Sequence, residues 1–222
     1  MIYNGVHAHR RRHRIVTNPI PVPAVLVITD PPPVPRTIED AVLQTLDAGC
    51  RWIMYREKEA SAENFRLVAK ILADLCLSYG SVLSINGDIQ VAREVCAGGV
   101  HLQSTDEIGL ARTALQSGAP VGVSCHSIAE AQCAELAGAD YVTLSPIFET
   151  ASKPGYGPAL GLGGLGEATE CLTIPVIALA GISSNNAADC IHHGAQGVAV
   201  MGGVMRASDI EVEVKGLISA LA

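Results

Sequence analysis

The chain has 222 residues, of which 49% are hydrophobic and only 4% aromatic, so it is long enough for one large α/β domain with a mainly aliphatic core. The formal net charge is −7, but the first 22 residues hold four of the 15 basic residues and none of the 22 acidic ones, which leaves −11 on the rest. A body this acidic is a poor nucleic-acid binder, and no apolar run approaches the ~20 residues that cross a bilayer, so we expect neither nucleic acid nor membrane as a partner.

The N-terminal segment and the cysteines indicate where the protein resides. Met1–Val22 contains HAHRRRHR and no apolar centre of a signal peptide, so we predict a disordered basic extension before a domain over residues 23–222. A tail that touches polyanions is the alternative. The seven cysteines show no C-x-x-C spacing, which argues against a disulfide framework or a zinc site, and most should be small core residues. We therefore expect a cytoplasmic protein.

Short apolar runs alternate with amphipathic segments throughout the predicted domain. Thr37 can cap the first amphipathic segment, which Gly49 ends, and Ser61 opens a long helix that extends to about Tyr79. Alternation of this kind indicates a parallel sheet with right-handed crossovers, and eight units predict a single (β/α)₈ TIM barrel, with an open doubly wound sheet as the alternative. The predicted strands are Ala24–Asp30, Cys50–Tyr55, Val82–Ile85, Gly99–Leu102, Val121–Ser124, Tyr141–Leu144, Val176–Leu179 and Gly197–Val200, and a final helix covers 208–221.

Cations follow two of the predicted strands, at the end of a barrel where active sites lie. Arg56 and Lys58 come after the second strand, and a guanidinium fork with a point charge suits a diphosphate. A surface ion pair between Arg56 and a neighbouring glutamate is the structural alternative. Lys153 belongs to a long loop rich in proline and glycine after the sixth strand, and we expect this loop to close over an anion.

Glycine turns follow the seventh and eighth strands. Gly181 lies in LAGIS, and Met201 and Gly202 lie in AVMGGV. Barrels commonly bind phosphate at this place through backbone N–H groups, which glycine allows an oxyanion to approach closely. Since glycine also simply ends strands, the turns alone are weak evidence, and the barrel register is what favours a phosphate site.

Oxygen ligands for Mg²⁺ follow the third and fourth strands. Asn86, Asp88 and Asp106 are hard donors of the kind that Mg²⁺ accepts while it keeps waters and substrate phosphates. The alternative for each aspartate is a helix cap, because both precede helical patterns.

A serine and a histidine follow the fifth strand in Ser124-Cys125-His126. These residues are too close in sequence for a catalytic triad, so we expect His126 to transfer a proton or to hydrogen-bond the substrate. His101, at the end of the fourth strand, is interpreted as a structural hydrogen-bonding residue.

Taken together, seven segments of the chain resemble a known superfamily. The series REK (56–58), SIN (84–86), GVHL (99–102), GVSCHSIAEA (122–131), ADYVTLSPIFETASK (139–153), IPVIALAGI (174–182) and GAQGVAVMGGV (194–204) resembles the thiamine phosphate synthase and thiazole tautomerase superfamily, in order, over about Ala24–Ala222. Synthases of this superfamily are (β/α)₈ barrels that join a hydroxymethylpyrimidine diphosphate to a thiazole phosphate and release diphosphate. The resemblance thus implies small phosphorylated pyrimidine and thiazole substrates.

The resemblance also implies a role for each matching residue. It makes Mg²⁺ the expected cofactor and leaves the number of chains open, with a homo-oligomer as one option. Diphosphate would be held by Arg56, Lys58 and Lys153 with Thr150 beside them, the pyrimidine or diphosphate by Asn86 and Ser124, magnesium by Asp106, and the thiazole phosphate by Gly181 and the backbone at Met201-Gly202.

Departures from the synthase pattern keep two alternatives open. Met54 stands where synthases usually carry glutamine, and Gly87 stands where they usually carry a magnesium carboxylate, unless Asp88 replaces it after a one-residue shift. The sequence before Asp106 also differs, and Ala180 replaces a usual glycine. Asn-Gly after the third strand is similar to tautomerases, which aromatise a thiazole carboxylate phosphate with a histidine at the position of His126. The second alternative is a barrel that binds phosphorylated thiamine precursors without turnover.

Overall fold

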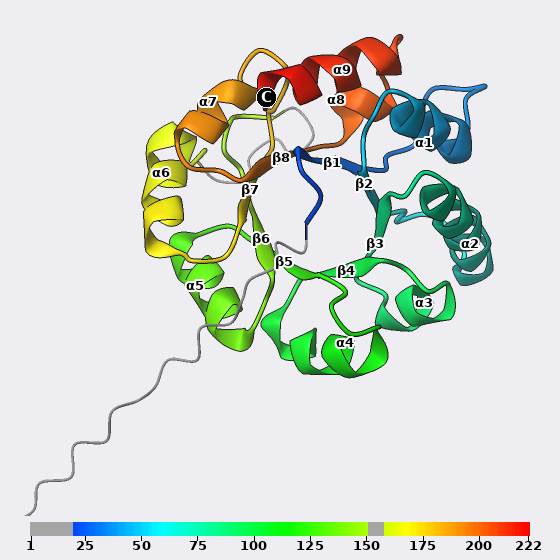
Figure 1. Cartoon of the computed structure of the whole chain (residues 1–222), viewed down its shortest axis with the longest axis horizontal. Helices are drawn as coiled ribbons and strands as arrows, with labels where there is room; N and C mark the ends of the chain where they lie inside the picture. The colour runs from blue at the N-terminus through cyan, green and yellow to red at the C-terminus, as the bar shows by residue number, and fades with distance from the viewer. Residues whose placement is uncertain (1–19, 151–157) are drawn as a thin grey trace, which may run out of the picture.

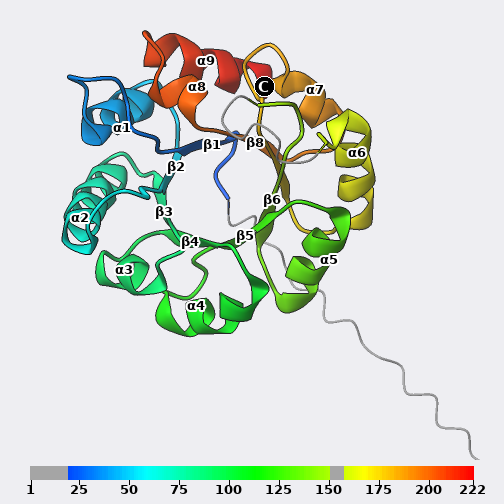
Figure 2. The same cartoon turned by 180° about the vertical axis from the view of Figure 1, so that it is seen from behind.

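The fold is a closed parallel barrel, seen in a computed structural model that describes residues 20–150 and 158–222. In these residues each of eight strands pairs in parallel with the next, and β1 pairs with β8. Helices surround the strands in a ring (Figures 1 and 2). The predicted (β/α)₈ barrel is confirmed, and the β1–β8 pairing excludes an open sheet. The strands are β1 (Ala24–Ile28), β2 (Trp52–Tyr55), β3 (Val82–Asn86), β4 (Gly99–Leu102), β5 (Val121–Cys125), β6 (Tyr141–Leu144), β7 (Val176–Leu179) and β8 (Gly197–Val200).

The helices follow the strands in alternation. Among the described helices, none is long and apolar enough to cross a membrane. They are α1 (Ile38–Asp47), α2 (Ala62–Ser78), α3 (Ile89–Glu94), the 3₁₀ turn η1 (Thr105–Glu107), α4 (Ile108–Ala114), α5 (Ile128–Ala137), α6 (Gly161–Cys171), α7 (Ala187–His192), α8 (Gly202–Met205) and α9 (Ile210–Ala220).

Side chains next to the helix starts explain where the first helices begin. Thr37 Oγ1 accepts from the N–H of Asp40 at 3.1 Å, and the Asp40 carboxylate accepts in return from the N–H of Thr37 at 3.3 Å, which forms a capping box. Ser61 caps α2 by accepting from the N–H of Asn64 at 3.2 Å. Gly49, just past α1, has a φ of 104°, which suits glycine. These predicted caps and the predicted stop are confirmed.

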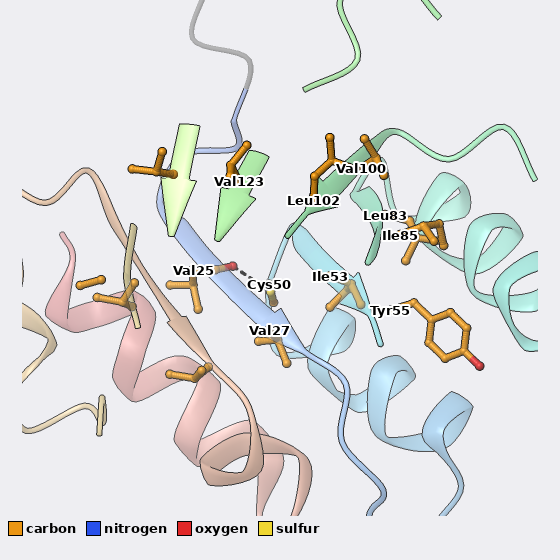
Figure 3. Packing of buried hydrophobic residues seen from close by; sticks show 14 of the residues in the cluster. Val25, Val27, Cys50, Ile53, Tyr55, Leu83, Ile85, Val100, Leu102 and Val123 are labelled. Carbon is orange, nitrogen blue, oxygen red and sulfur yellow. Dashed lines mark hydrogen bonds between the residues drawn. The ribbon is translucent and has the colours of Figure 1, made fainter. Parts of the chain in front are cut away.

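The outer core lies between the strands and the helix ring. Outward-facing strand residues such as Val25, Val27 and Ile53 pack there under the helices (Figure 3). Cys50 belongs to this cluster, and its thiol donates to the carbonyl oxygen of Val25 at 3.4 Å; burial raises its pKa to about 11. The prediction that most cysteines are core residues is confirmed for Cys50, Cys76, Cys125 and Cys190, whereas Cys96, Cys133 and Cys171 are exposed.

Two large aromatic side chains lie in the core inside the barrel. Trp52 and Tyr141 are fully buried, and their rings meet edge to face with centroids 4.8 Å apart. Glycine on a neighbouring strand makes room for them, since a Cβ at Gly122 would overlap the Tyr141 ring. Ile20, which lies in the range predicted as an extension, is also buried in this interior cluster. The interior is therefore a packed core.

Substitution of Gly122 tests this packing. Gly122→Ala should lower the free energy of unfolding by about 1–3 kcal/mol, the usual cost of overpacking, because the added methyl group overlaps the Tyr141 ring. Gly166→Ala in α6 is the control: nothing lies within 4 Å of its Cβ position, and alanine favours a helix by up to about 1 kcal/mol. Urea unfolding measures both, and an unchanged midpoint for Gly122→Ala would contradict the packing argument.

Candidate active site

A large cavity opens at the carboxyl ends of the strands. Its volume is about 1150 Å³, and residues that end or follow all eight strands line it. Most of the predicted site residues meet there, although they are scattered along the sequence. Those that line the cavity are Arg56, Lys58, Asn86, Ser124, His126, Thr150, Gly181, Met201 and Gly202. Lys153 lies outside the described residues, so its role stays a prediction.

Arg56 and Lys58 enter the cavity from the end of β2. The buried Thr29 holds this turn, because its hydroxyl donates to the carbonyl oxygen of Arg56 at 2.8 Å and accepts from the N–H of Arg56 at 2.9 Å. Among the described residues Arg56 forms no salt bridge, and Glu57 instead accepts from the N–H of Glu59 at 3.0 Å. The alternative of a surface ion pair for Arg56 is therefore wrong, and its guanidinium is available to an anion.

A neutral histidine forms part of the cavity floor. His101 Nδ1 lies 3.2 Å from the Tyr141 hydroxyl and Nε2 lies 3.2 Å from the Thr143 hydroxyl, so both ring nitrogens have partners. His101 is 4% exposed, and burial lowers its pKa to about 3. Deeper in the barrel the Trp52 N–H donates to Ser84 Oγ at 3.1 Å. The interpretation of His101 as a structural hydrogen-bonding residue is confirmed.

His126 lies at the rim, where β5 turns into α5. The backbone N–H of His126 donates to the Glu130 carboxylate at 2.7 Å, and the ring Nδ1 lies 3.3 Å from the same carboxylate. Ser127 caps α5 by accepting from the N–H of Glu130 at 3.2 Å, which fixes the turn that carries His126; Ser124 lies just before this turn, in β5. The histidine therefore has a carboxylate partner and lines the cavity, an arrangement that suits proton transfer or a hydrogen bond to substrate.

The glycine turns after β7 and β8 lie close to other backbone segments. Gly181 has a φ of 68°, and a Cβ there would come within 2.7 Å of the Glu149 carbonyl oxygen, so the turn after β7 packs on the loop after β6. Ala180, next to it, is also left-handed with a φ of 81°, and its carbonyl oxygen accepts from the N–H of Phe148 at 3.1 Å. Gly202 lies against the side chain of Arg206.

The structure does not bring the two predicted magnesium carboxylates together in the cavity. Asp88 lies in an adjoining groove, and its Oδ1 caps α3 by accepting from the N–H of Val91 at 2.8 Å. Asp106 is exposed in η1 and lines neither hollow. Asn86 lines both. No group of three or more His, Cys, Asp or Glu within the described part could hold a metal, so these side chains fit Mg²⁺ only with substrate phosphates as further ligands.

Asp30 and Arg206 are two charged residues of the cavity that the sequence did not point to. Asp30 follows β1 and Arg206 follows α8, and they form an ion pair. The strand end at Asp30 was visible in the sequence, but nothing in its spacing indicated a partner so far along the chain.

The sequence matches a known protein family over most of its length. Residues 25–204 match the thiamine monophosphate synthase family. The chain belongs to the thiamine monophosphate synthase family. Curated relatives include the thiamine-phosphate synthases of Clostridium novyi, 35% identical over 79% of this chain and 87% of that protein, and of Thioalkalivibrio sulfidiphilus, 38% identical over 84% and 90%. The structure of the thiamine phosphate pyrophosphorylase from Pyrococcus furiosus superimposes with a TM-score of 0.78, at 29% identity and coverage of 92% and 96%.

Departures from the synthase pattern can now be located in this member of the thiamine monophosphate synthase family. Met54 is buried and lines the cavity, so an apolar thioether stands where synthases usually carry the amide of glutamine. Gly87 has a φ of 77°, a conformation that favours glycine over a metal-binding aspartate. Ala180, which stands where synthases usually carry glycine, has a left-handed backbone with a φ of 81°.

The buried His101 should make stability depend on pH. A histidine in the unfolded chain has a pKa near 6.5, whereas the pKa of folded His101 is about 3. Between these two pH values only the unfolded chain takes up a proton. The contribution of His101 to the free energy of unfolding is present above pH 6.5 and is lost as the pH falls. The loss is about 1.4 kcal/mol per pH unit, or roughly 2 kcal/mol between pH 6.5 and 5. His101→Gln should remove this part of the decrease in urea unfolding. Tyr141→Phe, which keeps the histidine, should retain it, and equal slopes for wild type and His101→Gln would contradict the assignment.

Proposed function

We propose that the protein is a thiamine-phosphate synthase that transfers a hydroxymethylpyrimidine group from its diphosphate to a thiazole phosphate and releases diphosphate. The observation that carries the proposal is one cavity lined both by two cations and by two glycine turns. Cations after β2 lie on one part of its rim, and glycine turns after β7 and β8 lie on another. The curated relatives named above are thiamine-phosphate synthases, which supports the same activity.

The cations at the end of β2 suit the departing group. When the bond between the pyrimidine carbinyl carbon and the diphosphate breaks, negative charge builds on the leaving oxygens. Arg56 and Lys58 can stabilise this charge, and Thr29 fixes the backbone that presents Arg56, so little reorganisation is needed during the reaction. Thr150 and Lys153 belong to the loop after β6, and we place them beside the same diphosphate.

The thiazole phosphate would occupy the part of the cavity near Gly181 and Gly202. Asn86 and Ser124 line the wall between the end of β3 and the end of β5, and their amide and hydroxyl groups can orient the pyrimidine. Holding both substrates in one cavity makes the attack of the thiazole nitrogen on the carbinyl carbon effectively intramolecular.

The tautomerase alternative rests on a different observation. His126 lines the cavity with the Glu130 carboxylate 3.3 Å from its Nδ1, a pairing that would support proton transfer. This chemistry needs no diphosphate cations, whereas Arg56 and Lys58 both line the cavity. The synthase therefore accounts for more of the site.

A coupled assay tests the proposed activity. Purified protein with the pyrimidine diphosphate, the thiazole phosphate and Mg²⁺ should release diphosphate in proportion to the thiamine phosphate formed. Silence in this assay together with an ultraviolet change on the thiazole carboxylate phosphate tautomer would establish the tautomerase instead. Failure of both, with binding of the thiazole phosphate retained, would leave a non-catalytic binder.

A charge-removing variant sharpens the same test. Arg56→Ala should lower kcat by about 10²–10³-fold, the effect of removing one donor to a developing negative charge. Lys70→Ala is the matched control, because Lys70 is an exposed cation on α2 that pairs with Asp74 at 2.6 Å, away from the cavity. Equal activity of the two variants would rule out the assigned role of Arg56.

Magnesium belongs to this proposal as an ion that binds together with the diphosphate. When bound it would neutralise part of the phosphate charge. We assign it to Asp88, which shares a groove with Asn86, and to Asp106, which lines neither hollow and is assigned from the family resemblance alone. A cytoplasmic location and a homo-oligomer also stay predictions.

Neutral amides at the two carboxylates test the metal assignment. Asp106→Asn should raise the Mg²⁺ concentration required for half-maximal activity by about tenfold, the energy of one charged ligand contact. Asp88→Asn should raise it as well, while the cap on α3 survives because asparagine is an equally good N-cap. Magnesium titration of the initial rate, with thermal unfolding as the check on the fold, measures both. An unchanged requirement in both variants would remove these residues from the metal site.

A further inference from the structure

Arg206 lies directly on the glycine turn after β8. It follows the short helix α8, and a Cβ at Gly202 would collide with its guanidinium. Both residues line the cavity, together with Gly181 and Met201. A guanidinium therefore lies beside the backbone that we assign to the thiazole phosphate.

The guanidinium of Arg206 has donors to spare. Its NH1 pairs with Asp30, and its side chain is 49% exposed. The other two nitrogens, Nε and NH2, make no hydrogen bond or ion pair within residues 20–150 and 158–222. Because a guanidinium carries five N–H donors in a planar fork, one edge can hold the carboxylate while the remaining donors meet a phosphate.

Asp30 is placed to hold this side chain rather than to bind a substrate. Its side chain is only 14% exposed, and its buried Oδ2 makes no hydrogen bond within the described part of the chain, so its contact with Arg206 is an ion pair. A largely buried carboxylate without a cation is costly, which favours the arrangement in which Arg206 stays at the cavity edge.

A second contact fixes the backbone next to Arg206. Arg36, in the loop between β1 and α1, donates from NH1 to the carbonyl oxygen of Ala207 at 2.8 Å. The loop after β1 thus holds two consecutive residues of the chain after β8, one through its side chain and one through its backbone.

We propose that Arg206 is a phosphate-binding residue for the thiazole phosphate and that Asp30 is the positioning residue that holds it. The assignment rests on the proposed function, since it deepens the anion site at Gly181 and Gly202. An arriving phosphate meets the remaining guanidinium donors of Arg206 in addition to backbone N–H groups. Without Arg206, the carboxylate of Asp30 would face the same phosphate uncompensated.

Steady-state kinetics with each substrate varied in turn tests the assignment. Arg206→Ala should raise KM for the thiazole phosphate ~10- to 100-fold, the effect of losing a hydrogen bond to a charged group, and leave KM for the pyrimidine diphosphate unchanged. Arg206→Lys should recover part of the loss. Lys215→Ala, which removes an exposed cation of α9 paired with Glu211, is the control and should change neither KM. A rise in both KM values after Arg206→Ala would indicate a general structural defect and overturn the assignment.

The role of Asp30 has a readout that simple loss of structure would not produce. In Arg206→Ala the unpaired carboxylate repels the phosphate, so the double variant Arg206→Ala with Asp30→Asn should bind the thiazole phosphate more tightly than Arg206→Ala alone. A double variant no better than the single one would show that Asp30 does not face the phosphate.

Binding experiments separate this inference from the proposed activity. Calorimetry should show that wild type binds the thiazole phosphate more tightly than the unphosphorylated thiazole alcohol, and that Arg206→Ala loses this preference. Wild type that binds with an Arg206-dependent preference but releases no diphosphate would support the phosphate site and overturn the synthase. An active enzyme whose KM for the thiazole phosphate is unchanged by Arg206→Ala would overturn the proposed phosphate site but not the synthase activity.

Discussion

The pairing of β1 with β8 is the constraint on which the site depends. Gly197 allows it, because any Cβ there would collide with the backbone and side chain of Ala24 on the first strand. Closing this seam places the end of the first strand beside the end of the last one, and the end of β2 one strand further along. Asp30 meets Arg206 only because the seam is closed. A wider separation of β1 and β8 would both open the barrel and remove one wall of the cavity.

The local sequence pattern was enough to predict the strands and helices. The barrel arrangement was enough to predict which residues lie at the carboxyl ends of the strands. Runs such as Gly99–Leu102 and Tyr141–Leu144 have the predicted bounds because their ends coincide with turn residues. The Asp30–Arg206 pair was not predictable, since it joins the two ends of the domain and no helical or strand periodicity relates such positions. Nor could the sequence separate metal binding from capping at Asp88, because one carboxylate serves either role and only the contact to Val91 shows the cap.

Charge is distributed unevenly within an acidic protein. The cavity brings together Arg56, Lys58 and Arg206, of which only Arg206 has an acidic partner among the described residues. Asp30 follows β1, which lies between the strands that carry the two groups of residues that we propose bind anions. Under the proposed function, a carboxylate at this point lowers the positive potential between the two proposed anion sites, which favours two phosphorylated substrates at separate positions over one polyanion that spans both.

The cavity floor determines how the substrates must lie under the proposed function. Ile28, Met54 and Leu179 contribute apolar surface there, and His101 is neutral with both nitrogens engaged by Tyr141 and Thr143. No charged side chain among the described residues projects from the strands into this floor, whereas the cations lie on the rim. A phosphate directed inward would lose its hydration without gaining a partner. The pyrimidine ring therefore points down and the diphosphate points out, which leaves the carbinyl carbon between floor and rim, at the height where a thiazole anchored near Gly181 and Gly202 can reach it.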